Sequence, residues 1–207
     1  MPVTLLSSSS AVGGTVSSFD STGAKLLVVS GSSINSGLTH TDNKSNSWLS
    51  LIAFTDASHW LYMWACLSPQ SVGTGHSFTM GGSYSNIHVA AFDTDFGVAS
   101  ITRAAGTSPG SIASFSQPRL FLTNMTYATA ATPTIDSGFT VSSYRPYLGG
   151  YNLGGALGYK IQSSAGGENP AWSVGIATGL AEFRVAVEPG SGGSAVANRG
   201  LLTGGRR

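Results

Sequence analysis

Short apolar segments recur along this chain from about residue 24 to residue 188, and clusters of glycine, serine, asparagine and aspartate separate them. Such spacing is typical of many short β-strands. Apolar residues nowhere keep the i, i+3, i+4, i+7 spacing of an amphipathic helix over three turns, and glycine interrupts most windows long enough to form one. The sequence therefore predicts an all-β fold of about nine or ten strands.

Individual segments predict both buried and half-buried strands. Residues 25–30 contain an unbroken apolar run between Lys25 and Ser30, which is typical of a strand covered on both faces. Residues 181–187 alternate, so Glu182 and Arg184 are expected to face water while the apolar residues face a core. A short polar turn separates residues 47–54 from residues 59–66, and the two segments predict a hairpin.

Antiparallel strands without helical crossovers favour a β-sandwich or jelly roll, in which two sheets close over one core. We assign residues 19–188 to a single domain of this kind. Residues 1–18 are serine-rich and uncharged, and residues 189–207 are rich in glycine, yet both segments carry apolar residues. We therefore predict that they are arms that dock on a neighbouring subunit. The leucines expected to dock are Leu5, Leu6, Leu201 and Leu202.

Charged side chains are scarce. Lys, Arg, Asp and Glu make up 9% of the 207 residues, against roughly 25% in an ordinary globular domain. Gly, Ser and Thr supply 80 residues, while the hydrophobic share of 41% is enough to build a core. A formal net charge of +1 with scattered basic residues gives no field that would recruit a polyanion, so we expect no nucleic-acid partner.

Cysteine content and hydropathy exclude further classes of protein. Cys66 is the only cysteine, so one chain can form neither a disulfide nor a thiolate metal site, and we interpret Cys66 as a small buried hydrophobic residue. The longest apolar run, residues 60–67, falls well short of the ~18 residues of a membrane span, and we expect no membrane partner. Residues 1–18 lack the charged and apolar regions of a secretory signal, which predicts assembly in a cytoplasm.

Few residues stand in a pattern that carries chemistry. The histidines show no paired metal-ligand spacing; neighbouring strands could bring His76 and His88 together, but no third ligand is evident. Asp93 and Asp95 could bind calcium, act as acid and base in a hydrolase, or simply form a polar turn. Residues 189–194 resemble the glycine-rich nucleophile turn of chymotrypsin-like proteases but lack its aspartate, which favours a linker. We predict no catalytic residue, cofactor or metal site.

The most distinctive segment is residues 144–151, which we interpret as a loop. Tyrosine and arginine are favoured at protein interfaces, and tyrosine rings also stack on sugars. Packing within the fold, a subunit contact and a glycan contact all stay open for it. The residues concerned are Tyr144, Arg145, Tyr147 and Tyr151.

The order of several small motifs resembles that of the β-sandwich virion structural proteins of tailed bacteriophages. The resemblance covers about residues 20–188, and it departs at Ser45, where a glycine is expected before Asn46. The motifs, in chain order, are Asp42-Asn-Lys-Ser-Asn-Ser-Trp48, Trp60-Leu-Tyr-Met-Trp64, Gly75-His-Ser-Phe-Thr79, Ser137-Gly-Phe-Thr140, Asn169-Pro-Ala-Trp172 and Glu182-Phe-Arg184.

The resemblance implies a non-enzymatic virion component, namely a capsid decoration, tail or baseplate subunit that is assembled in the host cytoplasm. Its expected partners are other virion proteins and further copies of itself. A surface of Ser, Thr and Gly agrees with this interpretation, because charges buried between subunits must be paired. Two alternatives stay open: a carbohydrate-binding module for attachment to the host surface, and a hydrolase that uses Asp93 and Asp95.

Overall fold

A computed structural model describes residues 3–82, 85–115, 118–136, 138–148 and 153–185. These residues form fifteen β-strands and no helix, and every strand pairing is antiparallel, which confirms the predicted all-β sandwich. Residues 5–92 form β1 (Leu5–Val12), β2 (Thr15–Phe19), β3 (Leu26–Ser33), β4 (His40–Asp42), β5 (Leu49–Asp56), β6 (His59–Leu67), β7 (His76–Met80) and β8 (Ser85–Phe92). Residues 96–185 form β9 (Phe96–Ala105), β10 (Ile112–Phe115), β11 (Arg119–Tyr127), β12 (Thr140–Leu148), β13 (Leu153–Gln162), β14 (Gly166–Glu168) and β15 (Ala177–Val185).

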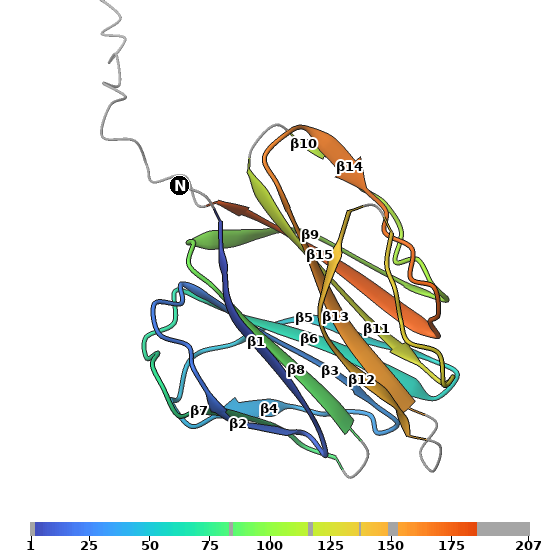
Figure 1. The fold of residues 1–207 in the computed structure, drawn as a ribbon, viewed down its shortest axis with the longest axis horizontal. Helices are drawn as coiled ribbons and strands as arrows, with labels where there is room; N and C mark the ends of the chain where they lie inside the picture. Colours follow the sequence, from blue (N-terminus) through green and yellow to red (C-terminus); the bar gives the residue numbers. More distant parts are fainter. Residues whose placement is uncertain (1–2, 83–84, 116–117, 137, 149–152, 186–207) are drawn as a thin grey trace, which may run out of the picture.

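The strands lie in four layers (Figure 1). Two large sheets form the middle: an N-terminal sheet with the order β1-β8-β3-β6-β5 and a C-terminal sheet with the order β12-β13-β11-β15-β9. An outer sheet, β2-β7-β4, covers the free face of the N-terminal sheet, and a ribbon of β10 and β14 covers part of the C-terminal sheet. Short strands such as β2, β4, β10 and β14 bring the described strands above the predicted number of nine or ten.

Apolar residues fill the spaces between the layers. The main core lies between the two large sheets and includes Leu26, Phe92, Leu120 and Phe183. A second core lies between the N-terminal sheet and the outer sheet. Strand β3 is therefore buried along its whole length, as its unbroken apolar run predicts.

The two halves of the chain repeat one topology. Counted from β1, the N-terminal sheet contains the first strand of its half of the chain, then the last strand, then the third strand, and then a hairpin. The C-terminal sheet, counted from β9, has the same order. The outer pairs β2–β7 and β10–β14 also correspond. Leu26 and Leu120 occupy equivalent positions, since each pairs with a phenylalanine of the last strand, Phe92 or Phe183. Because each large sheet is built by one half of the chain, this order does not establish a jelly roll.

The sequence shows little of this repeat. Residues 15–19 (Thr-Val-Ser-Ser-Phe) and residues 111–115 (Ser-Ile-Ala-Ser-Phe) match in pattern and occupy β2 and β10, where Val16 and Ile112 are both buried. The turns before Trp48 and Trp172 look alike in sequence but are not equivalent, because one precedes β5 and the other precedes β15.

The N-terminal segment differs from the predicted arm. Residues 5–12 form β1, which pairs with β8 of the same chain, so Leu5 and Leu6 belong to the sandwich. Leu5 packs against the main core, whereas the Leu6 side chain is 41% exposed. Val3 and Leu5 contact the main core of their own chain, and this burial favours a strand of the sandwich over an arm that docks elsewhere. Residues 186–207, including Leu201 and Leu202, lie outside the described residues.

The predicted hairpin is confirmed, since β5 pairs with β6 from Asp56 and His59 onward. Ala57 and Ser58 form its two-residue turn with φ angles of 45° and 66°, which is the geometry that matches strand twist in tight hairpins.

Ser45 adopts a φ of 57°, a left-handed conformation that favours glycine. This conformation costs a non-glycine residue about 1–2 kcal/mol, while glycine loses about 0.5–1 kcal/mol through its freer unfolded chain. We therefore expect Ser45→Gly to raise the free energy of unfolding by about 0.5 kcal/mol in urea denaturation. Ser47→Gly, at an exposed position without positive φ, is the control and should lower it. A loss with both variants would contradict the prediction.

Candidate functional site

The space between the two large sheets changes from apolar to polar along the strands. Near the starts of β3 and β11 it holds the main core, and towards their other ends it holds buried polar side chains from both sheets. We call this set the polar layer; its members are Ser30, Ser32, Asn86, His88, Asn124 and Thr126, all at most 1% exposed.

Hydrogen bonds link the sheets across the polar layer. The amide nitrogen of Asn124 donates to Ser30 Oγ at 2.8 Å and to the carbonyl oxygen of Tyr62 at 2.8 Å. His88 Nδ1 lies 2.9 Å from the hydroxyl of Ser143 on β12. Gly155 lets the sheets approach, because a Cβ atom there would lie 2.6 Å from Ser32 Oγ and 3.1 Å from His88 Nε2.

Several polar atoms of this layer have no hydrogen-bond partner within the protein. They are Asn86 Nδ2, Asn86 Oδ1, His88 Nε2, Asn124 Oδ1 and Thr126 Oγ1. Arg145 Nε on β12 is also buried without a hydrogen-bond partner. A buried polar atom left unpaired costs about 1–3 kcal/mol. The polar layer therefore has hydrogen-bonding capacity that the protein itself does not use, as expected where water or a polar ligand binds.

Burial keeps His88 neutral. Removal from water, with a smaller effect from the nearby Arg145 guanidinium, lowers the pKa of His88 to about 3. The ring is therefore uncharged near pH 7, and one of its nitrogens carries a proton while the other accepts.

The predicted Tyr144 to Tyr151 loop is mostly a strand. Tyr144, Arg145 and Tyr147 lie on β12, the edge strand of the C-terminal sheet, and Pro146 fits there because an edge strand has an unpaired side. Tyr144 is 45% exposed, and Tyr147 packs against a buried cluster that includes Trp172. Tyr151 lies outside the described residues. Arg145 pairs in register with Gly155, so it points towards the polar layer.

Ser21, His76 and Asp42 form a chain of contacts of the residue types found in serine hydrolases. Ser21 Oγ lies 2.9 Å from His76 Nδ1, and His76 Nε2 lies 3.3 Å from Asp42 Oδ1. The ring is reversed relative to a catalytic triad, in which serine faces Nε2. Ser21 and His76 are fully buried, and Gly73 N donates to Ser21 Oγ at 3.0 Å. The cluster therefore links the segment after β2 to β7 and β4 inside the protein.

Asp42 is the first residue of the motif from Asp42 to Trp48 and accepts hydrogen bonds from later residues of it. Its carboxylate accepts hydrogen bonds from Trp48 Nε1 at 2.6 Å and from Lys44 N at 2.7 Å. Burial alone would raise the pKa of Asp42, but these hydrogen bonds and the nearby His76 ring lower it. The motif from Asp42 to Trp48 thus has a structural explanation.

A buried ion network lies under the β10–β14 ribbon, and sequence reasoning missed it. The prediction that Glu182 faces water is wrong: Glu182 and Arg119 are both 0% exposed, because the ribbon covers this face of the sheet. Glu182 Oε1 lies 3.4 Å from Arg119 Nη1 and accepts from Arg184 Nε at 3.0 Å. Arg119 also donates to the carbonyl oxygens of Ala113 on β10 and Gly166 on β14, which fastens the ribbon.

The remaining predicted positions lie apart. Asp93 accepts from Thr4 N at 2.7 Å and Asp95 pairs with Lys25 at 2.9 Å, so the two carboxylates form a polar turn with separate partners. His76 and His88 belong to different sheets. Among the described residues, no three His, Cys, Asp or Glu side chains are grouped for a metal, and no helix is long and apolar enough to cross a membrane.

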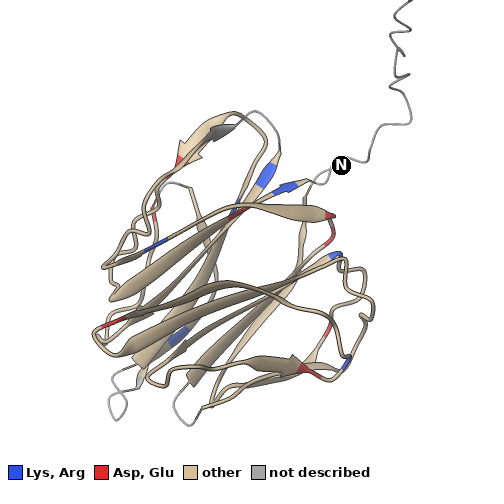
Figure 2. Cartoon of the chain, turned by 180° about the vertical axis from the view of Figure 1, so that it is seen from behind, with Lys and Arg blue, Asp and Glu red and all other residues tan. Residues whose placement is uncertain are grey.

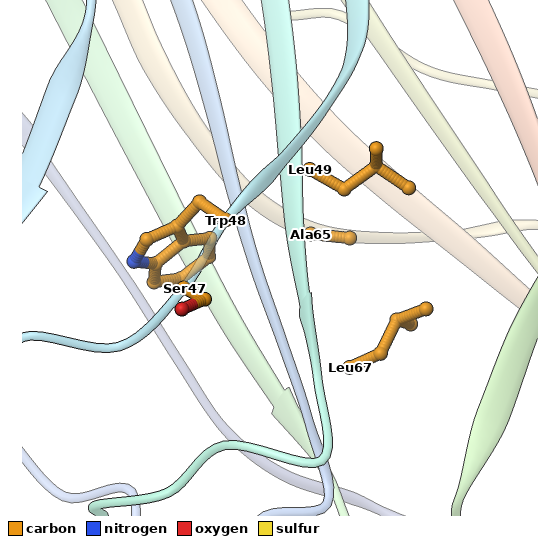
Figure 3. A pocket seen from close by; sticks show the side chains of 5 residues that line it. All are labelled: Ser47, Trp48, Leu49, Ala65 and Leu67. Carbon is orange, nitrogen blue, oxygen red and sulfur yellow. The ribbon is translucent and has the colours of Figure 1, made fainter.

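The edge of the N-terminal sheet carries a small apolar groove of about 260 Å³. Leu49, Ala65 and Leu67 extend to one side of β6 in this region and Trp48 to the other (Figure 3). Cys66 beside it is buried, as predicted, and burial raises the pKa of its thiol to about 11. The thiol is therefore uncharged near pH 7.

Comparison of the chain with protein-family models, curated proteins and solved structures found no match.

Proposed function

We propose that this chain is a non-enzymatic structural subunit of a tailed-phage virion, either a capsid decoration or a tail or baseplate component. The resemblance of its motif order supplies the class of particle. The sparse charge of the strands, visible in Figure 2, supports the proposal, because surfaces of Ser, Thr and Gly can be buried between subunits without unpaired charges.

The observation that carries the subunit contact is the edge strand β1. Its eight residues contain no charge and no proline, the devices by which proteins usually block an exposed strand edge. Leu6 and Val12 are 41% and 46% exposed on it. By contrast, the edge strand β12 carries Arg145 and Pro146. Ser8 Oγ on β1 donates to the carbonyl oxygen of Ser142 on β12 at 3.1 Å, but β8 is the only described strand that pairs with β1. A strand edge of this kind can accept a strand from a neighbour.

Quantitative mass spectrometry of density-purified particles tests the proposal. Amounts near those of the major capsid protein would support a capsid decoration, whereas a few copies would support the tail or baseplate. Absence of the chain from purified particles would overturn the proposal.

Lysine at the β1 edge tests the contact itself. We expect Leu6→Lys with Val12→Lys to lower incorporation at least tenfold, because a charge buried in a subunit contact costs several kcal/mol. The folded chain should keep its Tm within about 2 °C, since both side chains are exposed. Leu49→Lys on the edge strand β5 is the matched control, as Leu49 is also exposed. Normal incorporation of the double variant would remove β1 from the contact.

Glycan binding is the second candidate, and the exposed Tyr144 ring beside Arg145 favours it. Tyrosine rings on an exposed edge can stack on sugar faces. A host polysaccharide that raises Tm in wild type but not in Tyr144→Ala would support this candidate, and a polysaccharide without effect on wild type would count against it.

A further inference from the structure

Three buried hydrogen-bond donors without a partner belong to the polar layer and the adjoining strand β12. When the Ser143 hydroxyl donates to His88 Nδ1, the proton of the neutral ring lies on Nε2, which has no partner within the protein. Asn86 Nδ2 and Arg145 Nε are likewise buried and without a partner. Asn86 and His88 lie two residues apart on β8 and thus face the same side.

Register places these groups together. Ser32 pairs with Asn86 and Ser30 pairs with His88 in the N-terminal sheet. On the other side, Gly155 pairs with Arg145, and its backbone lies close to Ser32 and His88, since a Cβ atom there would be 2.6 Å from Ser32 Oγ and 3.1 Å from His88 Nε2. Residues from β3, β8, β12 and β13 therefore lie together at the polar end of the space between the sheets.

The charge of this region is positive and uncompensated. No described carboxylate forms an ion pair with Arg145, although Arg119, Arg184 and Lys160 all have such partners. Arg145 is half-buried on an edge strand, so its guanidinium lies between the interior and solvent. A partly buried guanidinium favours oxyanions, which it can bind through two parallel hydrogen bonds.

We propose that Arg145, His88 and Asn86 form a binding site for a small oxyanion, such as the carboxylate of an acidic sugar or an inorganic sulfate. Arg145 supplies the charge, and the N–H groups of His88 and Asn86 supply the inner donors. The Asn86 Oδ1 atom, which also lacks a partner, can accept from a hydroxyl of the same ligand. This site does not depend on the virion proposal or on the contact at β1.

Titration calorimetry of the full chain with glucuronate, sulfate and neutral glucose, at ionic strength held constant with sodium chloride, tests the site. We expect one or both anions to bind and glucose not to bind. Arg145→Gln should weaken anion binding at least tenfold, because it removes the charge. Arg103→Gln, an exposed arginine on the edge strand β9, is the matched control and should bind as wild type does.

A second measurement does not depend on a variant that folds. The Nε2–H signal of His88 in the NMR spectrum of the wild-type chain should shift during anion titration. Glucuronate alone would indicate a sugar acid, sulfate alone an inorganic anion, and both a general oxyanion site. Binding of neither anion by wild type, or equal binding by Arg145→Gln, would overturn the proposal.

Discussion

Glu182→Gln should lower the free energy of unfolding by about 3–5 kcal/mol, the usual cost of leaving one member of a buried ion pair without its partner. Glu182 and Arg119 are both 0% exposed, and glutamine removes the charge while keeping the shape. Arg119 would then remain buried with carbonyl and amide acceptors only. Urea denaturation at pH 7 measures the loss.

The chain supplies its own control for this variant. Lys25 stands directly before Leu26, as Arg119 stands directly before Leu120, but it pairs with Asp95 at the surface, where the two side chains are 45% and 46% exposed. Asp95→Asn should therefore change stability by less than about 1 kcal/mol. Equal losses in Glu182→Gln and Asp95→Asn would contradict the account of the buried network.

Acidification from pH 7 to pH 5 should lower the free energy of unfolding by about 3 kcal/mol. Burial lowers the pKa of His88 to about 3 and that of His40 to about 4, whereas both titrate near 6.5 in the unfolded chain. Below pH 6.5 the unfolded chain binds protons that the folded chain does not, so stability falls as pH falls. His88 contributes about 2 kcal/mol at pH 5, and His40, which is partly exposed, about 1 kcal/mol.

Urea denaturation at pH 7, 6 and 5 measures this dependence, and the range lies above the ordinary pKa of carboxylates near 4. His88→Gln should remove about 2 kcal/mol of the difference between pH 7 and pH 5, whatever its effect on stability at pH 7. The matched variant is His59→Gln at the β5–β6 turn. A wild-type stability that does not change between pH 7 and pH 5 would show that His88 takes up a proton without unfolding.

Much of the fold follows from local sequence pattern. Period-two alternation and the uninterrupted run before Ser30 predict antiparallel and doubly covered strands, because side chains along a strand point alternately to its two faces. Alternation does not tell whether water or another layer covers the second face. Glu182 shows this limit, since its position in the pattern is that of a surface residue, and only the β10–β14 ribbon, which is distant in sequence, buries it.

The candidate site was only partly predictable. Arg145 and Tyr144 stand out in sequence because they lie among tyrosines, glycines and a proline. His88 and Asn86 do not, since on β8 they alternate with apolar residues as surface polar residues would. The burial of both depends on pairing with β3, and that of His88 also on close approach to Gly155; both are long-range properties.

The repeated topology affects the order in which the chain can fold during synthesis. Every strand of residues 5–92 has its backbone partners within those residues, so the N-terminal and outer sheets can form before the second half leaves the ribosome. At that stage Leu26, Val28 and Phe92 would still lack the face that covers them. The nascent first half would thus expose an apolar sheet face until residues 96–185 have been synthesised. Slower translation of those residues would favour aggregation or pairing with another nascent chain.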